Sequence, residues 1–326
     1  MITTVTLNPA VDQTIIVDQY QLGQIHRVKV RRMDVGGKGI NVSKVIRLFD
    51  GKTTAIGYLG EENKQFFEQF FHQYDINNDF VLVDGTTRTN TKIIDLRNQQ
   101  TTEFNELGFY ISQKEINQLK EKIRMYEKKS KYIIFSGSMC QGSYSGLFEE
   151  YINQVENSHK LVIDATGEML LEGVKKSPFL IKPNIYEFKT TFGLSVSSKE
   201  DLIRKTLGIR EKFNIQWILL SMGAEGALLL SENCVLEADA VPVNVKSTVG
   251  AGDSMLGGFI YGYENWKDPV EALRYAVACG TMAVTKEGTE LFTKEEALAL
   301  FPKIKIKNIT SHYGSSIDMH TENLNF

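Results

Sequence analysis

Residues 247–253 read Ser-Thr-Val-Gly-Ala-Gly-Asp and lead into an apolar run over residues 254–263. We predict a strand over residues 241–245, then a glycine turn, then a helix over the apolar run. Bare backbone amides at the start of a helix bind anions. An aspartate is unexpected in a site that only binds an anion, because Asp253 would repel the anion. It is expected if Asp253 accepts a proton from a hydroxyl group that attacks phosphorus while the amides stabilise the transferring group. The alternative is that Asp253 only caps the helix.

A second glycine-rich segment, residues 36–41, reads Gly-Gly-Lys-Gly-Ile-Asn. It is not a P-loop, because glycine rather than serine or threonine follows the lysine, and it lacks the dinucleotide fingerprint G-x-G-x-x-G. Lys38 suits a phosphate group and Asn41 suits a sugar hydroxyl. The alternative is a tight turn before a helix over residues 41–49.

Two further segments follow short apolar runs, at positions where ligand sites of α/β proteins gather. Residues 182–187 read Lys-Pro-Asn-Ile-Tyr-Glu, so that Asn184 and Glu187 face the same way at a helix start and could hold Mg²⁺ through water. A capping box explains this pair equally simply, and taken alone we favour it. Residues 221–227, with two glycines three apart, suit either the edge of a nucleotide site or a plain hairpin turn.

Residues 2–7 predict a strand, and the short, almost wholly apolar runs at residues 132–135, 161–163, 179–181 and 217–220 are typical of buried parallel strands. Residues 113–130 have helical periodicity, and this alternation predicts an α/β fold with a doubly wound, mostly parallel sheet. Two polar segments, residues 12–34 and 86–105, lack that rhythm and predict a small β-sheet, either a lid over a cleft or an ordinary edge sheet. Residues 308–326 are polar and aperiodic, so we expect a poorly ordered tail.

The composition excludes several classes of protein. The 326 residues carry a net charge of −3 and 42% of them are apolar, which argues against a nucleic-acid binder and against disorder. No apolar run is long enough for a membrane span, and the N-terminus does not resemble a signal peptide. Cys140, Cys234 and Cys279 form neither a disulfide framework nor a metal pattern. We therefore expect a cytoplasmic protein without nucleic-acid or membrane partners.

Four segments, taken together and in their order along the chain, resemble the ribokinase-like, phosphofructokinase B family of sugar kinases. They are NPAVD ending at Asp12, GGK ending at Lys38, KPN-x-x-E at 182–187 and GAGD ending at Asp253. The resemblance runs from residue 2 to residue 307. It implies a Rossmann-like kinase domain with a small β lid, and a tail beyond residue 307. TLNPAVD, TRTNTKI and SMGAEGAL are most similar to the branch that phosphorylates D-fructose 1-phosphate, and tagatose-6-phosphate kinases are near neighbours.

The resemblance also implies roles for individual residues. Asp253 would be the catalytic base, and the anion hole would comprise Gly250, Ala251 and Gly252. The phosphorylated ketose would be bound by Asp12, Gly37, Lys38, Asn41, Arg88, Arg27 and Ser138. Mg-ATP would be bound by Lys182, Asn184, Glu187, Ser221, Gly223, Gly226, Gly250 and Gly252, with Asn184 and Glu187 holding the Mg²⁺. Independently of the resemblance, exposed lid sheets often pair with each other, which would give a homodimer through the lid. The alternative from another class of function is a non-catalytic sensor of sugar phosphates.

Overall fold

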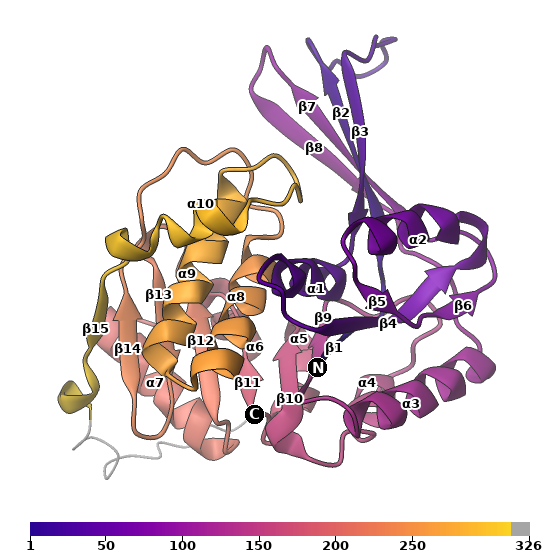
Figure 1. Cartoon of the computed structure of the whole chain (residues 1–326). Coiled ribbons are helices and arrows are strands. Elements are labelled where there is room, and N and C mark those ends of the chain that lie inside the picture. Colours follow the sequence, from indigo (N-terminus) through magenta and orange to yellow (C-terminus); the bar gives the residue numbers. More distant parts are fainter. Residues whose placement is uncertain (314–326) are drawn as a thin grey trace.

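The structure, a computed structural model, describes residues 1–313 (Figure 1). Its centre is an eleven-stranded sheet with the order β15-β14-β13-β12-β11-β10-β9-β1-β4-β5, in which β6 also pairs with β4. The strands of this sheet are β1 (Ile2–Thr6), β4 (Thr53–Gly60), β5 (Asn77–Asn78), β6 (Val81–Val83), β9 (Tyr132–Ser136), β10 (Leu161–Asp164), β11 (Leu180–Ile181), β12 (Trp217–Ser221), β13 (Ala227–Leu230), β14 (Val235–Ala238) and β15 (Ile306–Asn308).

The pairing within the sheet is parallel from β5 through β12 and antiparallel from β12 to β15. The predicted buried strands are therefore confirmed, and each lies within one residue of its expected ends. Four of them consist almost entirely of apolar residues because the sheet is covered on both faces, whereas β1 also buries Thr3, Thr4 and Thr6. Along β9, for example, Ile133 and Phe135 pack into one core, and Tyr132 and Ile134 pack into the other.

Helices form a layer on each face of the sheet. One face is covered by α3 (Gln113–Glu127), α4 (Leu147–Ile152), α5 (Gly167–Val174), α6 (Ile185–Thr191) and α7 (Lys199–Lys212). The other face is covered by α1 (Lys38–Leu48), α8 (Ala251–Trp266) and α9 (Pro269–Val284), and α10 (Lys294–Leu298) packs beside α9. On α2 (Lys64–Gln73), Phe67 and Phe71 pack against α1 and the base of the small sheet.

The two polar excursions meet in a separate four-stranded sheet, as predicted, and we call this sheet the lid. Its order is β3-β2-β7-β8, with β2 (Ala10–Val17) antiparallel to β3 (Val30–Gly36) and parallel to β7 (Thr89–Asp95), which pairs with β8 (Gln100–Asn105). Figure 1 shows the lid projecting away from the body of the molecule. Most residues of its strands are exposed or half-buried, because the sheet stands outside the main core.

Two expectations about secondary structure and order were wrong. Residues 241–245 do not form a strand, because Pro242 has no amide hydrogen to donate and β14 and its partner β15 end their pairing at Ala238. Residues 308–313 are not a loose tail, since β15 includes Asn308 and Tyr313 is buried against the main core. The rest of the expected tail, residues 314–326, lies outside the described residues. Within residues 1–313, every helix is too short or too polar to cross a membrane.

Candidate active site

A cavity of about 690 Å³ lies between the lid and the carboxyl ends of the parallel strands. Its walls include Ser136 at the end of β9, Lys182 just after β11 and Ser221 at the end of β12. Asp12 and Asn90 enter it from the lid. Because parallel strands present their carboxyl ends at one edge of a sheet, segments far apart in sequence meet here.

The glycine turn at residue 250 opens the cavity-facing end of α8. Gly250 adopts the left-handed conformation, with φ 74°, and the helix begins at the next residue, Ala251. The predicted start at residue 254 was therefore three residues late. Asp253 is not the helix cap, because Gly250 occupies that position. Asp253 lies in the first turn instead, only 5% exposed, and accepts a hydrogen bond of 2.8 Å from the Asn41 amide.

Asp253 has the electrostatic surroundings of a general base. Burial and the neighbouring Asp164 carboxylate raise the pKa of Asp253 to about 6, against the opposing effects of Lys38, Asn41 and Lys182. A carboxylate whose pKa lies near the working pH is largely unprotonated and still has enough proton affinity to take a proton from a substrate. A carboxylate that is buried and has a raised pKa can accept a proton, which a simple helix cap does not need to do.

Asp164, at the end of β10, is a member of the site that sequence reasoning missed. It is 2% exposed, and its carboxylate lies 3.1 Å from the Lys182 ammonium and accepts a 2.8 Å hydrogen bond from the Ser136 hydroxyl. Burial alone would raise the pKa of Asp164, but the Lys182 and Lys38 charges lower it below its usual range. Its position directly after a predicted strand, residues 161–163, was the signal that could have revealed it.

Lys38 and Arg88 lie in different electrostatic surroundings, although both line the cavity. The carboxylate of Asp164 raises the pKa of Lys38 against the effect of burial, and Asp253 and Glu187 raise it further. The charge of Arg88 acts on Asp12 instead, and its guanidinium donates to the backbone carbonyls of Asn8 and Glu106. Lys38 therefore belongs to the end of the cavity that holds Asp253, and Arg88 belongs to the lid.

The Gly-Gly-Lys segment brings the lid and α1 together. α1 begins at Lys38, three residues before the predicted start, because Gly37 makes the turn with φ 126°. At Gly36 an added Cβ would lie 2.3 Å from the Asp12 carboxylate, so a larger residue would displace the Asp12 side chain. Asp12 also accepts a hydrogen bond of 3.1 Å from the Asn90 amide, and burial raises its pKa.

The Asn184–Glu187 pair forms the capping box of α6, as we favoured from the sequence. The backbone N–H of Glu187 donates to Asn184 Oδ1 at 2.8 Å, and the backbone N–H of Asn184 donates to Glu187 Oε2 at 2.9 Å. Both residues also line the cavity. Since the box engages one carboxylate oxygen, the pair can serve the helix and still present oxygen to a hydrated cation.

Residues 221–227 form the hairpin between β12 and β13, so the turn interpretation is confirmed. Ser221 lines the cavity, but Gly223 and Gly226 are not among its lining residues. A Cβ on Gly226 would lie 2.0 Å from the Ala238 carbonyl, which explains the glycine by the close approach of β14. Any contact of these glycines with a nucleotide stays a prediction from the resemblance.

Unpartnered polar atoms mark the cavity as a binding site. Seven buried side-chain nitrogen or oxygen atoms within residues 1–313 have no hydrogen-bond partner. Five of them belong to residues that line the cavity, namely Thr6, Asn8, Asn41, Asn90 and Thr289. A buried polar atom without a partner costs free energy. A polar ligand that bonds to these groups would remove that cost.

The remaining predicted site residues divide into two groups. Gly37, Gly252 and Ser138 line the cavity, whereas Ala251 does not, although its amide belongs to the first turn of α8. Arg27 is exposed in the loop between β2 and β3 and does not line the cavity, so its role stays a prediction.

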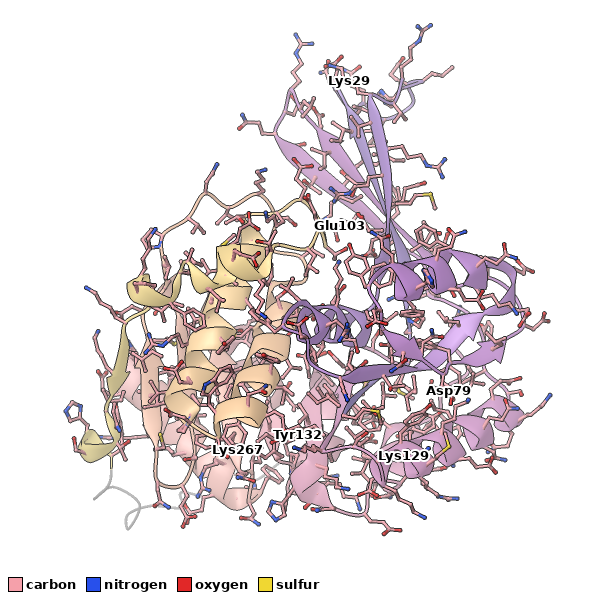
Figure 2. The ribbon with its side chains drawn as sticks, viewed as in Figure 1. Lys29, Asp79, Glu103, Lys129, Tyr132 and Lys267 are labelled. Carbon is pink, nitrogen blue, oxygen red and sulfur yellow. The ribbon has the colours of Figure 1, made fainter. Side chains whose placement is uncertain are left out.

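The lid also contributes lining residues that sequence reasoning missed, among them Lys92 and Glu103, which form an ion pair at 3.0 Å. Figure 2 shows Glu103 where the lid meets the body and Lys29 toward its far end.

Known proteins are similar to this chain over most of its length. The model of the pfkB family of carbohydrate kinases matches residues 5–296. The chain is 34% identical to the 1-phosphofructokinase of Borreliella burgdorferi over 287 residues, which is 88% of this chain and 92% of the other. It is 31% identical to the 1-phosphofructokinase of Escherichia coli K12, over 94% of this chain and 98% of the other. A crystal structure described as a phosphofructokinase of Staphylococcus aureus superposes with a TM-score of 0.82 at 28% identity, covering 95% of this chain and 99% of that one.

Proposed function

The chain belongs to the pfkB family of carbohydrate kinases, and from this premise we propose that it transfers the γ-phosphoryl group of ATP to the 6-hydroxyl of D-fructose 1-phosphate. The products are fructose 1,6-bisphosphate and ADP. The observation that carries the proposal is the buried Asp253, with its raised pKa, in the first turn of a helix that opens onto the cavity.

In this proposal Asp253 accepts the proton of the sugar hydroxyl as that oxygen attacks the γ-phosphorus in line. The backbone amides at Gly250, Ala251 and Gly252 stabilise negative charge on the transferring group. Lys38 supplies a positive charge at the same end, because Asp253 and Asp164 are its electrostatic neighbours. This assigns Lys38 to the phosphoryl group in transfer, whereas the resemblance assigned it to the phosphate already on the sugar.

The sugar phosphate would lie between α1 and the lid. Asp12, Asn41 and Asn90 present oxygen and amide groups to sugar hydroxyls, and the unpartnered Oδ1 atoms of Asn41 and Asn90 are free to accept from them. Arg88 would pair with the 1-phosphate, with Gly37 and Ser138 nearby in the lining. Binding of the phosphate at one end places the far hydroxyl at Asp253.

The nucleotide would lie on the side of β11 and β12, where Lys182, Asn184 and Ser221 line the cavity. Mg²⁺, when bound, neutralises charge on the nucleotide phosphates. Glu187 and Asn184 are the residues that would hold it through water. No group of three or more histidine, cysteine, aspartate or glutamate side chains suited to a metal occurs in the described part of the chain. The donor set is thus one carboxylate and one amide.

The test is ADP release by the purified protein with Mg-ATP and, separately, fructose 1-phosphate, fructose 6-phosphate, tagatose 6-phosphate and fructose. We expect fructose 1-phosphate to give the highest kcat/KM, because the relatives described above are 1-phosphofructokinases. Preference for tagatose 6-phosphate would keep the mechanism and change the substrate. Binding of a sugar phosphate without ADP release would instead favour a sensor and contradict the proposal.

The pH dependence of kcat/KM tests the role of Asp253. We expect activity to rise with pH through about 6, because the carboxylate must be unprotonated to accept a proton. A sugar phosphate also titrates near about 6, so the acid limb of the wild-type pH profile could arise from Asp253 or from the substrate. The variant Asn41→Ala removes the hydrogen bond that lowers the pKa of Asp253 and should move the limb to higher pH. Because the substrate titration is common to both proteins, an unmoved limb would contradict the assignment.

We further propose that two copies of the chain pair through their lids. Large apolar side chains are exposed on and around β3, among them Leu22, Ile25, Val28 and Met33. The edge strands β3 and β8 also present backbone groups to the outside. We expect a dimeric mass by light scattering, and a monomeric mass for the double variant Leu22→Lys/Ile25→Lys. A wild-type protein that is monomeric at micromolar concentration would contradict the pairing.

A further inference from the structure

The loop that follows α9, residues 285–290, forms a wall of the cavity that no sequence motif indicated. Gly288 and Thr289 line the cavity, and the Thr289 hydroxyl is one of the buried polar groups without a partner among residues 1–313. The Thr289 methyl carbon lies 3.5 Å from the position that a Cβ would take on Gly250. The loop therefore lies beside the glycine turn that we assign to phosphoryl transfer, at the distance that one added methyl group would fill.

The side chain of Arg32, in the lid, binds this loop, although Arg32 and Glu287 are 255 positions apart in the sequence. The Arg32 guanidinium, on β3, donates a 2.7 Å hydrogen bond to the Glu287 carbonyl. It lies within 3.7 Å of the Glu287 carboxylate and 3.9 Å of the Glu290 carboxylate. Its Nε donates at 2.7 Å to Asp34, which lines the cavity. Figure 1 shows the loop after α9 extending toward the lid.

Two features make this contact more than a surface ion pair. At Gly288, with φ 58°, an added Cβ would lie 2.4 Å from Arg32 Nη2, so the loop backbone and the guanidinium are in close approach. In addition, the buried Lys44 ammonium of α1 donates to the Thr289 carbonyl. The loop is thus held from the lid at Glu287 and from α1 at Thr289, and a shift of either support moves the threonine.

We propose that Arg32 is a positioning residue that couples the lid to the glycine turn, by fixing the 285–290 loop and with it Thr289 against Gly250. The inference rests on the proposed function and deepens it. A sugar phosphate held by Asp12 and Asn90 orders the lid, and Arg32 transmits that order to the wall beside the nucleotide. By linkage, each substrate then strengthens the binding of the other.

The experiment measures the affinity of ADP by calorimetry, without and with saturating fructose 1-phosphate. In the wild-type protein we expect the sugar phosphate to tighten ADP binding by about tenfold. In Arg32→Gln that coupling should fall below about twofold, while the affinity for each ligand alone changes less. The coupling is the ratio of the ADP Kd values measured without and with saturating fructose 1-phosphate in the same protein. If the loss of Arg32 leaves Asp34 unpaired and changes the sugar affinity directly, that change does not enter the ratio.

The matched control is Arg97→Gln, which removes the same charge from the turn between β7 and β8. Arg97 donates to Gln19 and makes no bond to the 285–290 loop, so this variant should keep the wild-type coupling. Thr289→Val, which removes only the hydroxyl, should reduce the coupling, and adding it to Arg32→Gln should reduce it no further. Additive losses would mean that Arg32 does not act through Thr289.

The outcomes separate the two proposals. If Arg32→Gln retains the wild-type coupling, or if the wild-type protein binds both ligands without coupling, the positioning role is wrong and the kinase function stands. If the wild-type protein binds ADP but none of the sugar phosphates, the proposed function fails and the positioning role fails with it. Loss of coupling in Arg32→Gln but not in Arg97→Gln supports both.

Discussion

We expect Asp253→Asn to lower kcat by about a thousandfold, while the Kd values for ATP and the sugar phosphate change by less than about threefold. The amide has the shape of the carboxylate and can still accept the hydrogen bond from Asn41, but it cannot take the hydroxyl proton. The measurement is ADP release at saturating substrates, together with calorimetric Kd values. Turnover near that of the wild type would show that another group is the base.

The same variant carries its own control for folding. Burial raises the pKa of Asp253, which means that its charge costs stability at neutral pH. Replacing it by a neutral amide should therefore leave Tm unchanged or raise it. A loss of activity together with a higher Tm separates a chemical role from a structural one, because a residue needed only for folding would lower both.

Asp164→Asn is expected to destabilise the protein by about 3–5 kcal/mol at pH 7, because it leaves the buried Lys182 ammonium without its partner. The measurement is chemical unfolding. The pKa of Asp164 is lowered in the folded protein, so its stabilisation is present above its ordinary value of 3.8 and is lost as pH falls. The difference between variant and wild type should accordingly shrink in acid.

Two controls make this expectation specific. Asp79→Asn removes a carboxylate of the more exposed pair with Lys122 and should cost about 1 kcal/mol or less. The double variant Asp164→Asn/Lys182→Met removes both partners of the buried pair and should recover much of the lost stability, but not the activity. If the single and double variants were equally unstable, the cost would not come from an unpaired charge.

The sequence determined the frame of this protein. Runs such as residues 132–135 are short and apolar at every position, and this pattern is typical of strands covered on both faces. The glycines at 36, 37 and 250 mark places where a side chain would clash or the backbone must turn left-handed, and these constraints are local. The lid was predictable because residues 12–34 and 86–105 are polar and lack helical periodicity, unlike the buried strands and the helices between them.

Helix boundaries and the strand at 241–245 were predicted less well. The helices at Lys38 and Ala251 begin earlier than expected, because a glycine with positive φ lets the helix start at the very next residue. A strand needs a partner, and nothing in residues 241–245 shows that the neighbouring strand has already ended.

Only the tertiary structure decided the electrostatics and the supports of the site. Asp164, Lys182 and Lys38 are far apart in sequence, and their mutual pairing depends on which strands are neighbours in the sheet. The contact of Arg32 with Glu287 joins residues 255 positions apart. Charge interactions depend on distance and burial, neither of which a local motif encodes. The sequence alone therefore named the chemical groups of the site, and the fold determined which of them act on one another.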